Sequence, residues 1–208
     1  NFGKLFEFYS NNDWKLPMKH PGIIGLPIKM SKLAAGNNQD NTMRRKDREM
    51  DAAFALEVLQ KAQYVTVSMT RPDGTPYAVP LSLAEGGDGE TFYFHCAKGG
   101  EKLDCIRHNP VVCLSAVSYC RPVVSPKEGD FTLEYKSAIA MGRAELVEDE
   151  NEKIEALRAI CTRFLPHHMA AFDDAVARSL QITAVVRIKL AGKPQGKKKQ
   201  YDSNGDEM

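Results

Sequence analysis

Six segments of alternating apolar and polar residues, separated by turn residues, dominate the chain after its first third. In the first segment Val65, Val67 and Met69 fall on one face, which is typical of a half-buried β-strand. The turn Arg71-Pro72-Asp73-Gly74 follows it, and proline at φ near −65° and a permissive glycine predict a hairpin to the second segment. The predicted strands are Tyr64–Thr70, Tyr77–Leu83, Thr91–Cys96, Val111–Ser118, Phe131–Val147 and Ile182–Leu190.

Helical periodicity lies between some of these strands but forms no long strand–helix–strand series. Met50, Phe54 and Val58 recur every four residues, which predicts a helix over Asp47–Gln63 with Asp47 as its cap. Further helices are predicted over Glu101–His108, from Asp149 onward with Glu152 in a partial capping box, and over Met169–Leu180. Hairpin-linked strands with helices outside them predict a mainly β fold, a six-stranded antiparallel barrel with flanking helices. Closure of the barrel removes exposed sheet edges.

The composition along the chain predicts three parts. Residues 1–42 combine three prolines and a polar run with many apolar side chains. We therefore expect an extension, either an arm on a surface such as a neighbouring subunit or a partly ordered tail. A folded domain is expected over residues 43–191. Residues 192–208, with Lys197, Lys198 and Lys199, are expected to be a solvated tail, because charge runs are usually solvated.

The overall composition argues against several classes of function. The 208 residues include 28 Lys and Arg against 27 Asp and Glu, a net charge of +1, so we expect no nucleic-acid partner. No apolar run approaches the ~20 residues that span a bilayer, so we expect no membrane segment. The five cysteines form no CxxC pair, and the N-terminus has no secretory pattern. These features favour free thiols and a cytoplasmic location.

One segment is rich in chemistry: residues 92–104 contain a strand, a turn with Gly99 and Gly100, and the start of a helix. Lys98 and Lys102 flank this turn. Backbone N–H groups at a helix N-terminus point toward an anion, and lysine adds a full charge, so a phosphate suits this place. Taken alone, the same pattern also describes an ordinary solvated turn.

Several blocks of the sequence carry a family resemblance. They are Arg44–Met50, Pro76–Ser82, Tyr93–Ala97 with Gly100 and Lys102, Asn109–Cys113, Tyr135–Ser137 and Gly142–Ala144. Together they resemble the nitroimidazole-resistance branch of the pyridoxamine 5′-phosphate oxidase-like, FMN-binding split-barrel superfamily. The resemblance runs from about Met43 to Leu190 and leaves the first 42 residues uncovered.

The resemblance implies a six-stranded split barrel and a homodimer with one FMN at each of two subunit-interface sites. It implies that Val79, Pro80, Leu81 and Ser82 lie along the flavin ring and ribityl chain. It further implies that His95, Cys96 and Ala97 follow the cofactor on the neighbouring strand, and that Gly100 and Lys102 hold its phosphate. Glu101 is a departure, because the oxidase branch is richer in Arg and Ser at this turn. That departure weakens the expected phosphate affinity and disfavours pyridoxamine phosphate as the substrate.

His95 has two interpretations: a hydrogen-bonded core or rim histidine, or, on the resemblance, a proton donor beside the flavin and a small-molecule substrate. A third is a haem ligand, since some split-barrel relatives bind haem. Cys96 is expected to be a small apolar residue rather than a nucleophile. No metal site is expected at His167-His168, because adjacent helical residues point different ways.

The function predicted from these features is that of an FMN-dependent oxidoreductase that reduces a small molecule, for example a nitroaromatic. The bound flavin supplies the redox chemistry in such a protein. No GxGxxG motif follows a strand, so no nicotinamide site is visible and the reductant is not identified. A non-catalytic flavin- or haem-binding carrier or sensor of the same fold therefore stays open as the alternative. Trp14 and Tyr119 are further residues that are able to cover a flavin.

Overall fold

The computed structural model describes residues 43–208, and the arm predicted over residues 1–42 lies outside them. Within the described residues the strands are β1 (Glu49–Met50), β2 (Val65–Thr70), β3 (Pro76–Leu81), β4 (Ala84–Glu85), β5 (Thr91–Ala97), β6 (Val111–Val124), β7 (Phe131–Leu146), β8 (Thr183–Leu190) and β9 (Gln195–Lys199). The α-helices are α1 (Ala52–Lys61), α2 (Glu101–His108), α3 (Glu150–Phe164) and α4 (Phe172–Ser179). Short 3₁₀ turns cover Lys46–Arg48, Pro166–Ala171 and Leu180–Ile182.

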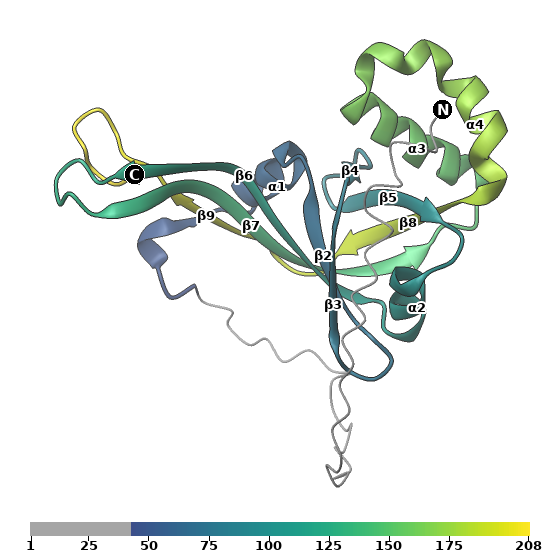
Figure 1. The fold of residues 1–208 in the computed structure, drawn as a ribbon, viewed down its shortest axis with the longest axis horizontal. Helices are drawn as coiled ribbons and strands as arrows, with labels where there is room; N and C mark the ends of the chain where they lie inside the picture. The colour runs from purple at the N-terminus through teal and green to yellow at the C-terminus, as the bar shows by residue number, and fades with distance from the viewer. Residues whose placement is uncertain (1–42) are drawn as a thin grey trace, which may run out of the picture. The chain divides into compact units, whose positions relative to one another are not determined.

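All strand pairs are antiparallel, and the strands of the described chain form one nine-stranded sheet with the order β3-β2-β6-β7-β8-β5-β4. Strand β9 pairs with β1 and β7 off this path. Figure 1 shows helices α3 and α4 beside β5 and β8, with the long β6–β7 hairpin extending away from them. The mainly antiparallel fold with flanking helices is as predicted. Its sheet has nine strands rather than six, because β1, β4 and β9 join the six predicted ones.

The core lies inside the curved sheet, where burial follows the strand period. Along β5, Phe92 and Phe94 are fully buried, whereas Tyr93 and His95, which alternate with them, are half-buried. Phe92 and Phe94 pack in one cluster with side chains of α1, α2, β2, β6 and β8. A smaller cluster lies under α3 and α4, around Phe172 and Val185.

Helix α1 begins later than predicted. Its first residue is Ala52, and the side chain of Asp51, not Asp47, accepts the capping hydrogen bond from the N–H of Phe54 at 2.8 Å. Asp47 instead forms an ion pair with Arg45. The prediction failed because both aspartates precede the same apolar pattern, and only the backbone path selects the cap. At α3 the predicted cap is confirmed, since Asp149 accepts from the N–H of Glu152 at 2.8 Å.

Strand β6 is longer than predicted. The predicted strand ends at Ser118, yet β6 continues through Pro122 to Val124 with a register shift between Val117 and Tyr119. Strand β2 pairs with β6 only over Cys113–Ser115, so Pro122 pairs with β7 alone and no second neighbour needs its missing N–H.

The prediction of a solvated tail is wrong for Gln195–Lys199. These residues form β9 and pair with Tyr135–Ile139 of β7. Gly196 allows this docking, because an added Cβ there would lie 2.7 Å from Cδ1 of Phe54 on α1. Lys199 is buried, and its Nζ donates to Oγ1 of Thr132 at 2.7 Å. The charge run hid this strand because lysine stems pack against apolar surface while their ammonium groups find polar partners.

No helix among residues 43–208 is long and apolar enough to cross a membrane.

Candidate functional site

The best candidate site lies where β5 ends and α2 begins. Gly100 occupies the N-cap of α2 with φ of +117°, a backbone conformation that residues with a Cβ rarely adopt. No side chain caps this helix end. A Cβ added at Gly99 or Gly100 would meet no heavy atom within 4 Å. The glycines therefore keep open space beside N–H groups that lack a side-chain cap, which is the geometry that admits an anion.

Lys102 lies on the first turn of α2 and faces the end of β5. Its charge acts electrostatically on both His95 and Cys96, so the fold brings these three predicted residues together. Ala97, the last residue of β5, is exposed at the start of the glycine turn. One continuous strand–turn–helix segment thus supplies a cation, an imidazole and uncapped N–H groups at one place.

The protonation states at this place are set mainly by burial. Burial, and then the charge of Lys102, lower the pKa of His95 from its ordinary value of 6.5. Burial raises the pKa of the Cys96 thiol, and the opposing effect of Lys102 is smaller. His95 is therefore a neutral imidazole at neutral pH and Cys96 a thiol. A thiol is a weaker nucleophile than a thiolate, so burial disfavours a nucleophilic role for Cys96.

Of the residues predicted to line the flavin ring, Val79, Pro80 and Leu81 lie on β3, at one end of the sheet order, and Ser82 follows its last residue. Val79 and Leu81 are half-buried and pack against the core, whereas Pro80 and Ser82 are exposed. Pro80 suits an edge strand, because it has no N–H to donate to a second neighbour. The expectation that His95 lies on the strand next to Val79–Ser82 is wrong for the sheet of this chain, because β3 pairs with β2 whereas β5 pairs with β4 and β8.

A side-chain contact that the sequence did not reveal connects the β2–β3 turn to α2. Arg71 donates from Nε to the carboxylate of Glu101 and from Nη1 to the carbonyl of Pro76 at 2.7 Å. Its guanidinium also lies over the ring of Tyr77, 5.1 Å from the centroid. Glu101 is the residue that departs from the family pattern, and Arg71 neutralises it. The turn motif around Arg71 was the only local signal, and it indicated a bend rather than a charge partner.

The other sequence candidates lie elsewhere. Tyr119 is on the extended part of β6 and donates its hydroxyl to Glu134 at 3.0 Å. His167 and His168 are exposed on a 3₁₀ turn. Between Met43 and Met208, no group of three or more His, Cys, Asp or Glu is arranged to hold a metal ion. Trp14 is outside the described residues.

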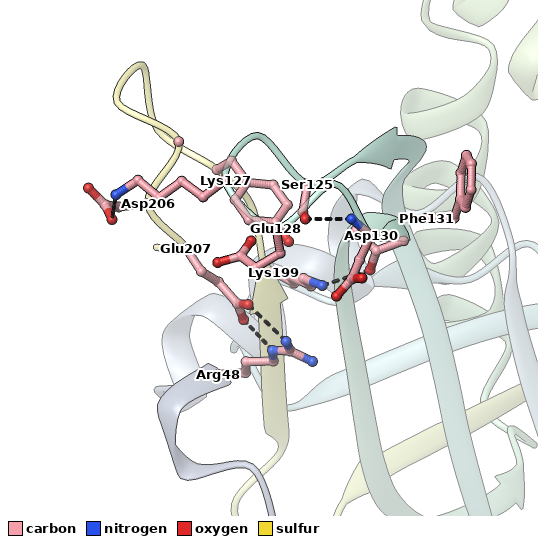
Figure 2. A pocket seen from close by; sticks show the side chains of 12 residues that line it. Arg48, Ser125, Lys127, Glu128, Asp130, Phe131, Lys199, Asp206 and Glu207 are labelled. Carbon is pink, nitrogen blue, oxygen red and sulfur yellow. Dashed lines mark hydrogen bonds and ion pairs between the residues drawn. The ribbon is translucent and has the colours of Figure 1, made fainter.

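A polar pocket of about 530 Å³ lies at the far end of the β6–β7 hairpin, against the C-terminal residues. Figure 2 shows Arg48 paired with Glu207, Lys127 with Asp206, and the ring of Phe131 turned away from these charges. The pocket contains none of the predicted site residues. Two of its three cations are paired with carboxylates, and the lining carries both signs of charge.

Strands β6 and β7 carry an apolar stripe on their outer face, formed by Val111, Val117, Ile139 and Met141. Their exposed fractions are 43%, 53%, 49% and 43%. The pairing of Cys113 with Met141 and of Ser115 with Ile139 places these side chains on one side of the ladder. A contiguous exposed apolar surface of this kind is typical of a protein–protein contact. We call this set the outer apolar stripe.

Comparisons with known proteins agree with this architecture. A family model described as pyridoxamine 5′-phosphate oxidase matches residues 51–192, which include β2 to β8 and the β5–α2 site. No curated protein sequence matches the chain.

Solved structures share the fold at low identity. One is a protein assigned to 5-nitroimidazole antibiotic resistance from Bacteroides thetaiotaomicron, with 23% identity, coverage of 72% of this chain and 85% of that one, and a TM-score of 0.61. The flavocytochrome Anf3 from Azotobacter vinelandii has 21% identity, coverage of 81% and 79%, and a TM-score of 0.67. An FAD- and haem-binding protein from Mycobacterium smegmatis has 22% identity, coverage of 70% and 69%, and a TM-score of 0.59.

Proposed function

The chain belongs to the pyridoxamine 5′-phosphate oxidase family, and we propose that it is an FMN-binding oxidoreductase that reduces a small, for example nitroaromatic, molecule. The observation that carries the proposal is the β5–α2 site. Lys102, His95 and the uncapped start of α2 meet there, inside the segment that the family model matches. The nitroimidazole-resistance protein with a similar fold supports the choice of substrate class.

The residues present fit a phosphorylated flavin. Gly99 and Gly100 leave room for the phosphate against the first N–H groups of α2, and Lys102 supplies a positive charge beside it. Cys96 and Ala97 continue along the cofactor from this end. A bound flavin supplies hydride or electron transfer, and the protein supplies position and electrostatics.

The remaining parts of the site have defined tasks in this proposal. Val79, Pro80 and Leu81 of β3 and Ser82 just after it line the ring and ribityl chain, with exposed positions available to a ligand at the sheet edge. His95 is the catalytic residue. As a half-buried neutral imidazole it can donate a hydrogen bond to the substrate from its protonated ring nitrogen, and it donates a proton only from the imidazolium form, which its lowered pKa confines to lower pH.

We further propose a homodimer with the flavin at the subunit interface. The outer apolar stripe supports it. Covering its four exposed apolar side chains on β6 and β7 with a second copy removes apolar surface from water, which stabilises the dimer. All five cysteines are free, which supports a reducing cytoplasmic location.

A second candidate function is a non-catalytic flavin or haem carrier. Two structures with this fold are described as a flavocytochrome and as an FAD- and haem-binding protein. The lowered pKa of His95 also favours it, since only an unprotonated ring nitrogen can bind haem iron.

The absorption spectrum of the purified protein, followed by turnover, separates these functions. The proposal predicts the near-ultraviolet and blue bands of a flavin, and bleaching of those bands by a chemical reductant with recovery when a nitroaromatic is added. A Soret band would instead favour haem binding. Flavin that is reduced but never reoxidised by any acceptor would favour the carrier.

A further inference from the structure

One charge at the start of α2, that of Glu101, is not used by the site as described. Glu101 is the first residue of α2 and stands between Gly100 and Lys102, where a phosphate is proposed to bind. A carboxylate there opposes a dianionic ligand, since like charges repel and both favour the positive end of the helix. The negative charge of Glu101 must therefore be neutralised if a phosphate is to bind at this helix start.

Arg71 provides that compensation from another element. Its Nε donates to Oε1 of Glu101. The same guanidinium is held by the carbonyl of Pro76 at 2.7 Å and by the ring of Tyr77 at 5.1 Å. These three contacts hold the guanidinium of Arg71 between the β2–β3 turn and the start of α2. The side chains of Arg71 and Glu101 remain 35% and 50% exposed, so both charges still interact electrostatically with a ligand that binds from solvent.

Helix geometry places the Arg71–Glu101 pair beside Lys102, and Glu101 does not pair with Lys102. Glu101 and Lys102 are consecutive, so their side chains diverge by about 100° around the helix axis. Glu101 points toward the β2–β3 turn, where Arg71 binds it, and Lys102 acts on His95 and Cys96 of β5. The two side chains therefore leave the uncapped N-terminus in different directions.

We propose that the Arg71–Glu101 pair sets the charge at the phosphate end of the site, and that Arg71 determines specificity for a phosphorylated over an unphosphorylated flavin. This inference rests on the proposed flavin function. Arg71 cancels the carboxylate that would otherwise reject the phosphate, and Lys102 then supplies the net attraction.

The test is a double-mutant cycle that measures the ratio of the riboflavin and FMN dissociation constants. Because the pair is partly exposed, Arg71→Met should weaken FMN about threefold to fivefold and riboflavin less than about twofold. Glu101→Gln should tighten FMN by about threefold, since it removes a negative charge and leaves Arg71 in place. The double variant should return the ratio to within about twofold of the wild type.

A matched control removes a similar ion pair from the same helix. Arg107 pairs with Asp104 at 3.2 Å toward the other end of α2, and Arg107→Met should leave the ratio unchanged. Thermal melting without ligand verifies that each variant is folded.

Equal weakening of both flavins by Arg71→Met, without recovery in the double variant, would show that the pair only ties the turn to the helix and would overturn the inference. A wild-type protein that binds neither flavin would instead reject the proposed function, and this inference with it. If the wild type prefers FMN but the substitutions at Arg71 and Glu101 leave the ratio of the two dissociation constants unchanged, this inference is rejected and the proposed function is not.

Discussion

Lys102 is the side chain on which phosphate binding depends most directly. It stands on the first turn of α2, close enough to His95 and Cys96 to act on both electrostatically. Lys102→Ala should weaken FMN by about tenfold or more and spare riboflavin, because a charge-assisted contact contributes roughly 1.5–3 kcal/mol. Isothermal titration with both ligands measures the difference. Equal losses for the two flavins would place Lys102 away from the phosphate.

His95 should affect turnover more than folding. His95→Ala should lower the turnover of an accepted nitroaromatic by ~10²-fold or more if the imidazole donates a proton. FMN should stay bound, because the phosphate anchor lies on α2. His95→Gln should retain part of the positioning but not the proton transfer. Steady-state kinetics on flavin-loaded protein gives the answer, and a folded, loaded, fully active His95→Ala variant would remove this residue from the mechanism.

The lowered pKa of His95 also predicts a pH dependence of stability. The folded protein holds His95 neutral below its ordinary pKa of 6.5, whereas the unfolded chain binds a proton there. The unfolded state therefore binds more protons in this window, and stability falls as the pH drops below about 6.5. His95→Gln should flatten this part of the profile. Urea unfolding at pH 5 and pH 8 tests it, and an identical pH dependence in both proteins would contradict it.

At the scale of elements, β9 depends on its close approach to α1. A Cβ on Gly196 would lie 2.7 Å from Cδ1 of Phe54, 3.2 Å from Cβ of Met50 and 3.3 Å from the backbone nitrogen of Ala55. Gly196→Ala should therefore destabilise the protein by about 1–3 kcal/mol, the usual cost of overpacking. Urea unfolding of ligand-free protein measures this loss.

Gly99→Ala is the matched control for that substitution, because an added Cβ at Gly99 meets nothing within 4 Å. It should leave the free energy of unfolding nearly unchanged. If Gly196→Ala were equally neutral, β9 would not be held closely against α1.

At the scale of the whole molecule, the outer apolar stripe predicts the assembly. Ile139→Glu should dissociate the homodimer, because a charge at the centre of an apolar contact is buried without a partner. Sedimentation velocity at micromolar concentration should show a monomer. Val124→Glu is the control, since Val124 is 54% exposed but lies at the last position of β6, seven residues beyond Val117. A wild-type monomer that still carries flavin would contradict the dimer.

Local sequence determined much of this molecule. The six strand segments, the Arg71–Gly74 turn and the Asp149 cap followed from interactions within a few residues, which a pattern records directly. The grouping of His95, Cys96 and Lys102 also followed, because one continuous strand–turn–helix segment contains all three. The roles assigned to Val79–Ser82 remain predictions.

Contacts between distant segments decided the rest. Strand β9 forms because β7 offers it a ladder and Gly196 fits against α1, although its own residues read as a solvated charge run. Pro122 is tolerated within β6 because β2 ends before it. Glu101 is neutralised by Arg71, thirty positions earlier. None of these follows from local spacing, since each depends on which elements the folded chain brings together and on the room left between them.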